Sequence, residues 1–155
     1  MAAVILGAVC GCGAPVDVDL TTPSEAEAEQ CRDLVSDLPD EVDGLEQRDT
    51  DPDSDLVAAW GDPAVVLRCG VAKPPELVAS SLCYEVNGVG WFATENGEPL
   101  DGSGPTTGTV VFTTIGRSPY VEVTVPDDPD RSAGDPLADL AGPVDAYTSV
   151  QMPCQ

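Results

Sequence analysis

TVVFTTIGRSPYVEVTV, residues 109–125, predicts an antiparallel hairpin, and this hairpin decides the character of the fold. Two β-forming runs, 109–115 and 120–125, flank the turn Gly116-Arg117-Ser118-Pro119. Valine occupies positions 121, 123 and 125, whereas Glu122 and Thr124 lie between them. Because successive strand residues point to opposite faces, this alternation predicts a sheet with one buried face and one face in water.

Four further runs predict strands of the same sheet. Residues 82–86 and 89–93 flank Asn87-Gly88, which is the strongest short signal for a hairpin. Residues 56–60 and 65–71 flank Gly61-Asp62-Pro63, a typical turn sequence. The Gly- and Pro-rich residues 95–107 predict a mobile loop.

A helix is expected on either side of these strands. Thr22 can cap the first, with Pro23 at the first helical position and Glu25 completing a capping box. This helix has one apolar stripe before Pro39, made of Cys31, Leu34, Val35 and Leu38. Asp135 is expected to cap a short second helix, with Pro136 at its first position. The pattern predicts an α+β fold: an antiparallel sheet of about five to six strands, with an N-terminal and a short C-terminal helix packed on one face.

The composition excludes several classes of function. The 155 residues suit one domain, and 28 acidic against 6 basic residues give a net charge of -22. Such a charge repels phosphate backbones and anionic lipid head groups, so no nucleic acid is expected as a partner. The chain has no histidine, which excludes Ser-His-Asp and Cys-His nucleophile pairs and His-ligated metal sites. The acidic run Asp49–Asp55 alternates like a calcium loop but lacks the Gly and the bidentate Glu of an EF-hand. We therefore predict no catalytic residue, no cofactor and no metal site.

The N-terminus predicts export and lipid anchoring. Residues 2–9, AAVILGAV, are too few to span a bilayer as a helix but are typical of the apolar region of a signal peptide. Cys12 follows Gly11 and has Val9 three positions before it, which is the pattern of a bacterial lipobox. Cleavage there would leave Cys12 to carry acyl chains, and two or more chains anchor a protein stably. We predict a signal peptide and lipobox at 1–12, a flexible tether at 13–21 and a single domain at 22–155.

No Lys or Arg precedes the apolar run, which departs from the usual signal peptide. Two alternatives therefore stay open. One is a buried N-terminal strand followed by two unrelated cysteines. The other is a longer N-terminus that forms a transmembrane helix.

Four cysteines fall in the predicted domain: Cys31, Cys69, Cys83 and Cys154. An even number in an exported protein indicates disulfides, and four cysteines allow three pairings. Cys69 shares a strand face with apolar residues, and Cys31 lies on the helix stripe that must cover such a face. A Cys31–Cys69 bridge would join helix to sheet, which leaves Cys83 and Cys154 to hold the C-terminal tail.

Three blocks of the chain resemble the DUF3515 family. They are AAWGDPAVVLRCGV (58–71), VNGVGWF (86–92) and FTTIGRSPYVEVTVP (112–126). With a helix that holds a cysteine before Leu38-Pro39, they follow the family's order over roughly residues 30–145. The resemblance implies an actinobacterial envelope protein with a signal peptide, lipobox or transmembrane segment, and it implies no reaction. Cys31 and Cys69 match cysteines of the family pattern, which favours their pairing, whereas Cys83 and Cys154 look like additions in this chain.

Five residues are candidates for binding a ligand: Trp60, Arg68, Trp91, Arg117 and Tyr120. Two tryptophans and an arginine on an exposed sheet face could bind an aromatic or sugar ligand. Arg117, which lies in the predicted hairpin turn, could bind a carboxylate or phosphate. The alternative, which we favour, is that both tryptophans lie in the core, that Arg68 pairs with an acid and that Arg117 is exposed or forms a local ion pair.

We expect a cell-envelope lipoprotein, anchored at the outer face of the cytoplasmic membrane or secreted. Its role would be that of a non-enzymatic binding or accessory module, with an envelope protein or a cell-wall precursor as partner. The alternative is a carboxylate-based hydrolase or transferase acting on cell-wall glycan or peptide. A deep cleft with two carboxylates, one of them with a raised pKa, would support that alternative. A flat, aromatic-rich sheet face would favour binding.

Overall fold

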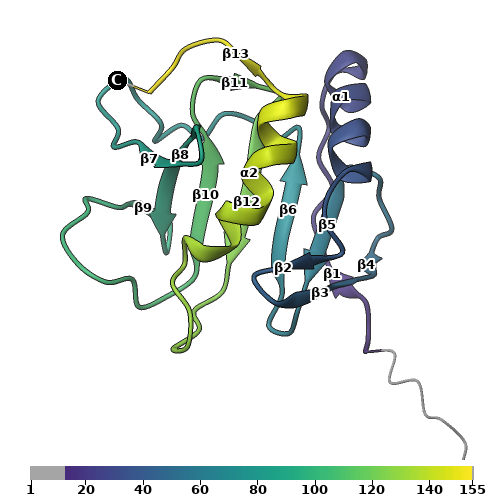
Figure 1. The fold of residues 1–155 in the computed structure, drawn as a ribbon. Coiled ribbons are helices and arrows are strands. Elements are labelled where there is room, and N and C mark those ends of the chain that lie inside the picture. The colour runs from purple at the N-terminus through teal and green to yellow at the C-terminus, as the bar shows by residue number, and fades with distance from the viewer. Residues whose placement is uncertain (1–12, 155) are drawn as a thin grey trace, which may run out of the picture.

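The computed structural model describes residues 13–154 (Figure 1). Two helices and a mostly antiparallel sheet confirm the predicted α+β class. The main sheet has nine strands in the order β2-β3-β5-β6-β12-β10-β8-β7, and β9 pairs with β8. The signal peptide, the lipobox and Cys12 of the predicted N-terminus lie outside the described residues.

All six strands that the sequence predicts belong to this sheet. Their bounds are β5 (Val57–Trp60), β6 (Val65–Cys69), β7 (Tyr84–Val86), β8 (Val89–Glu95), β10 (Val110–Thr114) and β12 (Val121–Val125). The prediction of five to six strands was too low because three short polar strands, β2 (Glu41–Val42), β3 (Leu45–Arg48) and β9 (Glu98–Pro99), extend the sheet. Strands of two to four residues carry too little alternation to be recognised.

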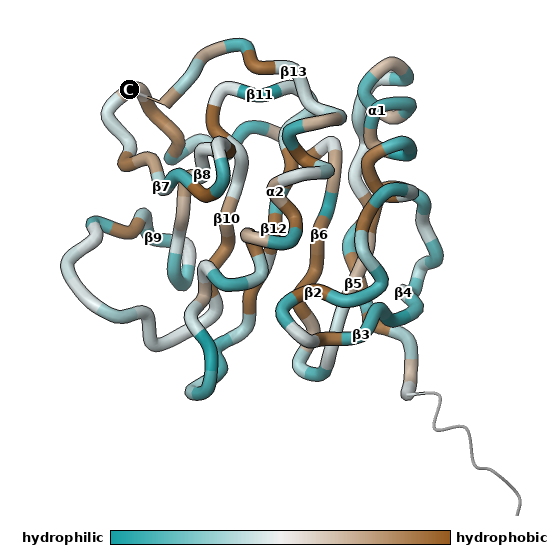
Figure 2. Tube along the Cα trace, in the orientation of Figure 1, coloured by the Kyte–Doolittle hydropathy of each residue, from teal (hydrophilic) through white to brown (hydrophobic). Residues whose placement is uncertain are grey.

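One face of the sheet, here called the core face, carries the hydrophobic core. In register across four neighbouring strands lie Leu67, Val123, Phe112 and Ala93. All four are buried, and both helices, α1 (Glu25–Ser36) and α2 (Asp135–Tyr147), contribute side chains such as Leu34 and Leu140 to the same cluster. Figure 2 shows apolar residues along β6, β10 and β12. The opposite side, here called the outer face, carries Arg68 and Glu122.

Helix α1 begins two residues later than predicted. Ser24 is its N-cap, and Ser24 and Glu27 form the capping box that was assigned to Thr22 and Glu25. The preceding residues are held by contacts with the sheet: the Thr21 hydroxyl donates to the carbonyl of Cys69 at 2.7 Å, and Pro23 packs against Gly70. These nonlocal contacts keep the chain extended until Ser24.

Helix α2 also differs from its prediction at the cap. Gly134 is the N-cap and Asp135 is the first helical residue, so Asp135 is not the cap that the sequence predicted. The Asp135 carboxylate instead accepts a hydrogen bond from the Ser132 backbone N–H at 2.9 Å. The helix has 13 residues and is not short, because it continues through Pro143.

Two segments predicted to be flexible are bound to the domain. In the predicted tether, 13–21, strand β1 (Val16–Asp17) pairs with β4 (Thr50–Asp51) in parallel, and the Val16 N–H donates to Asp49 at 2.8 Å. In the predicted loop, 95–107, β9 pairs with β8. Strands β1 and β9 have two residues each, which is too few for an alternating side-chain pattern to reveal them.

The structure confirms both disulfides, Cys31–Cys69 and Cys83–Cys154. The first joins α1 to β6 within the core, where both cysteines are fully buried. The second joins the segment before β7 to the C-terminal tail and lies directly over Gly90 on the outer face. A Cβ on Gly90 would overlap the sulfur of Cys154 and lie 2.8 Å from that of Cys83. No helix within residues 13–154 is long and apolar enough to cross a membrane.

Candidate functional site

The two tryptophans lie in the core and not on an exposed sheet face. Trp60 and Trp91 are both 0% exposed. The Trp60 indole N–H donates to the carbonyl of Pro39 at 3.0 Å, whereas the Trp91 indole N–H is buried without a partner among the described residues. In this conformation neither ring offers a surface to a ligand.

Arg117 is a structural link between three segments. It lies in β11 (Arg117–Ser118), which pairs with β13 (Ser149–Val150), and is only 5% exposed. Its guanidinium donates to the Asp145 carboxylate at 2.7 Å, to the Thr148 hydroxyl at 3.2 Å and to the Gly88 carbonyl at 3.2 Å. These bonds join two hairpin turns to the C-terminal end of α2. Its donors are therefore already engaged within the protein.

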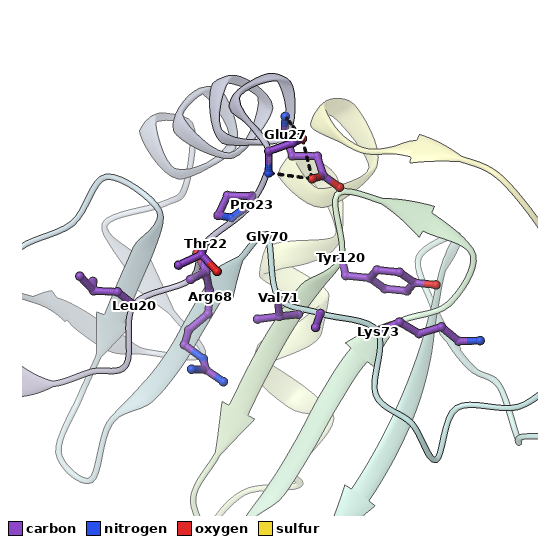
Figure 3. A pocket seen from close by; sticks show the side chains of 12 residues that line it. Leu20, Thr22, Pro23, Glu27, Arg68, Gly70, Val71, Lys73 and Tyr120 are labelled. Atoms are coloured by element: carbon purple, nitrogen blue, oxygen red, sulfur yellow. Dashed lines mark hydrogen bonds between the residues drawn. The ribbon is translucent and has the colours of Figure 1, made fainter.

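Arg68 and Tyr120 come together on the outer face, beside Lys73. Two adjoining hollows share Lys73 and Tyr120, and we call them together the Lys73 groove. The first, about 460 Å³, lies between the entry to α1, Arg68 and residues 70–73 (Figure 3). In Figure 3 the Tyr120 and Lys73 side chains extend in the same direction, and Arg68 lies on the other side of Val71.

The second hollow, about 220 Å³, is lined mainly by apolar groups. They include Leu77, Val78, Ile115, Met152 and the Cys83–Cys154 disulfide. Leu77 is buried and anchors the segment between β6 and β7, whereas Val78 is 55% and Met152 61% exposed. The rim of the hollow therefore presents apolar side chains to solvent.

Glycines allow the segments around the groove to approach one another. Gly70 has a φ of +79°, and a Cβ there would lie 2.6 Å from Pro23. The Gly70 N–H donates to the carbonyl of Tyr120 at 2.8 Å. This hydrogen bond joins the start of residues 70–73, which line the groove, to the residue that precedes β12. At the other end, a Cβ on Gly116 would overlap the backbone of Met152. Larger residues at these two positions would push the groove walls apart.

The charge of the groove differs from that of the rest of the protein. Its lining holds one carboxylate, Glu27, although the chain has 28 acidic residues. Arg68 is neutralised by its cross-strand neighbour Glu122 at 2.7 Å. Lys73 is exposed, and no carboxylate within residues 13–154 forms an ion pair with it. By contrast, the hollow beside β3 is lined by Glu41, Glu46, Asp49 and Asp62.

Glu27 lies at the edge of the groove and belongs to the start of α1. A hydrogen bond from the Ser24 hydroxyl (2.7 Å), assisted by one from the Ser24 backbone N–H (3.0 Å), lowers the pKa of Glu27. The pKa values of Asp101, beside the Ser103 hydroxyl, and of Asp128, beside the Asp130 N–H, are also lowered. A general acid requires a raised pKa, and these three groups depart in the other direction.

The donor set fits binding better than catalysis. The groove offers one ammonium, one phenol and an apolar wall, but no pair of carboxylates. Within the part of the chain that the structure describes, no three Cys, Asp or Glu side chains are grouped so as to hold a metal ion. Sequence reasoning missed Lys73 as a site residue, and its being the single lysine was the one signal that could have marked it.

Comparison with known proteins finds one family. A family model described as a protein of unknown function, DUF3515, matches residues 1–152. No curated protein matches the chain, and no solved structure matches it.

Proposed function

The chain belongs to the DUF3515 family, and from that premise we propose that it is an extracytoplasmic lipoprotein, anchored through Cys12, which binds a partner in the Lys73 groove. The partner is an envelope protein or a cell-wall precursor. The single observation that carries the binding role is the acid-poor groove, whose lysine forms no ion pair among the described residues, in a chain of net charge -22.

The disulfides support the extracytoplasmic location. Disulfides persist in oxidising compartments and are rare where glutathione keeps thiols reduced. All four cysteines of residues 13–154 are paired. The lipobox at Val9-Cys10-Gly11-Cys12 is the sequence feature that favours a membrane anchor over free secretion.

The arrangement of the helices supports a site on the outer face. In this proposal α1 and α2 both cover the core face, since side chains of both belong to the one hydrophobic cluster. The outer face then carries connecting segments, among them residues 13–24, the segment between β6 and β7, and the C-terminal tail with Met152 and Cys154. Binding sites are commonly formed by such connecting segments on a rigid sheet.

Mass spectrometry of the membrane fraction tests the anchor. We expect an N-terminal fragment that begins at Cys12 and carries acyl chains, and we expect Cys12→Ser to release the protein from the membrane. Cys10→Ser is the matched control and should leave the protein anchored. An unacylated protein with residues upstream of Cys12 would overturn the anchor.

Site-specific cross-linking in the envelope tests the binding role. A photoreactive amino acid replaces Tyr120 in the groove or, as a control, the exposed Val150 outside it. We expect a defined adduct from position 120 alone, and we expect Lys73→Glu to abolish it. An identical adduct pattern from both positions would show that the groove is not the binding site.

A further inference from the structure

We infer that the Lys73 groove binds a single-chain amphiphile with one carboxylate head group, the head at Lys73 and the chain in the apolar hollow. This inference rests on the proposed binding function and narrows the partner from the two given above to a cell-wall precursor of this ligand class. It follows from the order of groups along the groove: a cation and a phenol where the two hollows meet, and apolar side chains beyond them.

The charge count favours a monoanion. Arg68 is already paired with Glu122, and the Glu27 carboxylate already accepts hydrogen bonds from Ser24, so Lys73 is the charged group of the lining that is left to pair with a ligand. A carboxylate matches that charge, whereas a phosphate dianion would add a second negative charge to an acidic protein.

The apolar hollow favours a chain over a small ion. Val78 and Met152 are exposed large apolar side chains on its rim, and Leu77 and the disulfide lie beside them. Covering this surface with methylene groups removes apolar area from water on both partners. Lys73 and Tyr120 line both hollows, so a ligand held by its head at these residues has its chain directed along the wall.

Calorimetric titration of the oxidised full chain with decanoate tests the inference. Decanol supplies the same chain without charge, and butyrate supplies the head without the chain. We expect decanoate to bind and the two control ligands to bind at least tenfold more weakly. Over the series from butyrate upward, each methylene that enters the hollow should tighten the Kd by about fourfold. Equal affinity for decanoate and butyrate would show that the groove does not bind the alkyl chain. Equal affinity for decanoate and decanol would show that it does not bind the carboxylate head group. Either result would overturn the inference.

Matched variants place the ligand in the groove. Lys73→Glu should weaken decanoate binding by about tenfold or more, whereas Arg32→Glu makes the same charge change at an exposed cation of α1 that lines neither hollow and should leave the Kd unchanged. Val78→Ser should weaken it by about fivefold, and Val150→Ser, outside the groove, should not. A Kd for decanoate that is unchanged in both Lys73→Glu and Val78→Ser would overturn the inference.

Cross-linking from position 120 separates this inference from the proposed function. A Lys73-dependent adduct to a protein or a wall fragment, with no decanoate binding in solution, would overturn the amphiphile and leave the binding role in place. Absence of both the adduct and decanoate binding would overturn both proposals.

Discussion

The two disulfides stabilise opposite faces of one sheet, in different surroundings. Cys31–Cys69 lies in the core cluster that also contains Trp60 and Trp91, where side chains fill the space. Cys83–Cys154 lies over Gly90 on the outer face and forms part of the wall of the Lys73 groove. The chemically conspicuous residues therefore serve the fold, whereas Lys73, which forms no ion pair among the described residues, lies where a ligand can reach it.

Removing the core disulfide should give the largest loss of stability. The bridges close loops with sequence separations of 38 and 71 residues, so chain entropy assigns about 4 kcal/mol to each. Cys31→Ala/Cys69→Ala also leaves space in the packed core, so we expect it to lower the free energy of unfolding by about 5 kcal/mol. Cys83→Ala/Cys154→Ala should cost about 4 kcal/mol, the chain-entropy contribution alone, because these partly buried cysteines leave little space when they are shortened. Denaturant unfolding of both variants measures the difference.

Mild reduction of the native protein checks the same ranking independently. We expect an alkylating reagent to label Cys83 and Cys154 before Cys31 and Cys69, because the latter pair is fully buried. Labelling of the core pair first, or an equal loss of stability in the two double variants, would contradict the difference between the faces.

Two arginines provide the next comparison, with a smaller effect. Arg117→Met removes donors from the Thr148 hydroxyl and the Gly88 carbonyl in a buried position, and should cost about 2 kcal/mol. Arg68→Met breaks a pair whose side chains are 25% and 16% exposed, and should cost about 1 kcal/mol or less. Unfolding curves that rank the two in the reverse order would show that the outer face carries more of the stability than its packing indicates.

The sequence predicted what depends on local pattern. Short β-forming runs beside turn sequences identified all six main strands, and the helix stripe that contains Cys31 indicated the partner of Cys69. The start of α1 was wrong because a nonlocal contact between Pro23 and Gly70 governs it. The groove could not be predicted, because its shape depends on the fold of residues 70–83. Its charge depends on Glu122 pairing across the sheet with Arg68, which leaves Lys73 available to a ligand.

The two buried tryptophans differ in one hydrogen bond, which predicts a difference of about 1 kcal/mol. Trp60→Phe leaves the Pro39 carbonyl without its donor, whereas Trp91→Phe removes an indole N–H that has no partner among the described residues. Both changes remove similar volume from fully buried sites. We therefore expect Trp60→Phe to lower the free energy of unfolding more than Trp91→Phe. Equal losses would indicate that Trp91 has a partner such as buried water.

Glu27 gives the smallest effect, and it joins the two regions because it belongs to the capping box of α1 and lines the groove. Its pKa is lowered in the folded state, so its ionised form contributes stability above the ordinary pKa of a glutamate. That contribution is lost as the pH falls through the lowered folded pKa. Glu27→Gln retains a capping-box acceptor but does not titrate. We expect wild type to be slightly more stable than Glu27→Gln at pH 7 and equal to it at pH 2, measured by thermal unfolding. Subtracting the variant cancels the effect of the other acids, so a difference that persists at pH 2 would show that the carboxylate acts through packing and not through its charge.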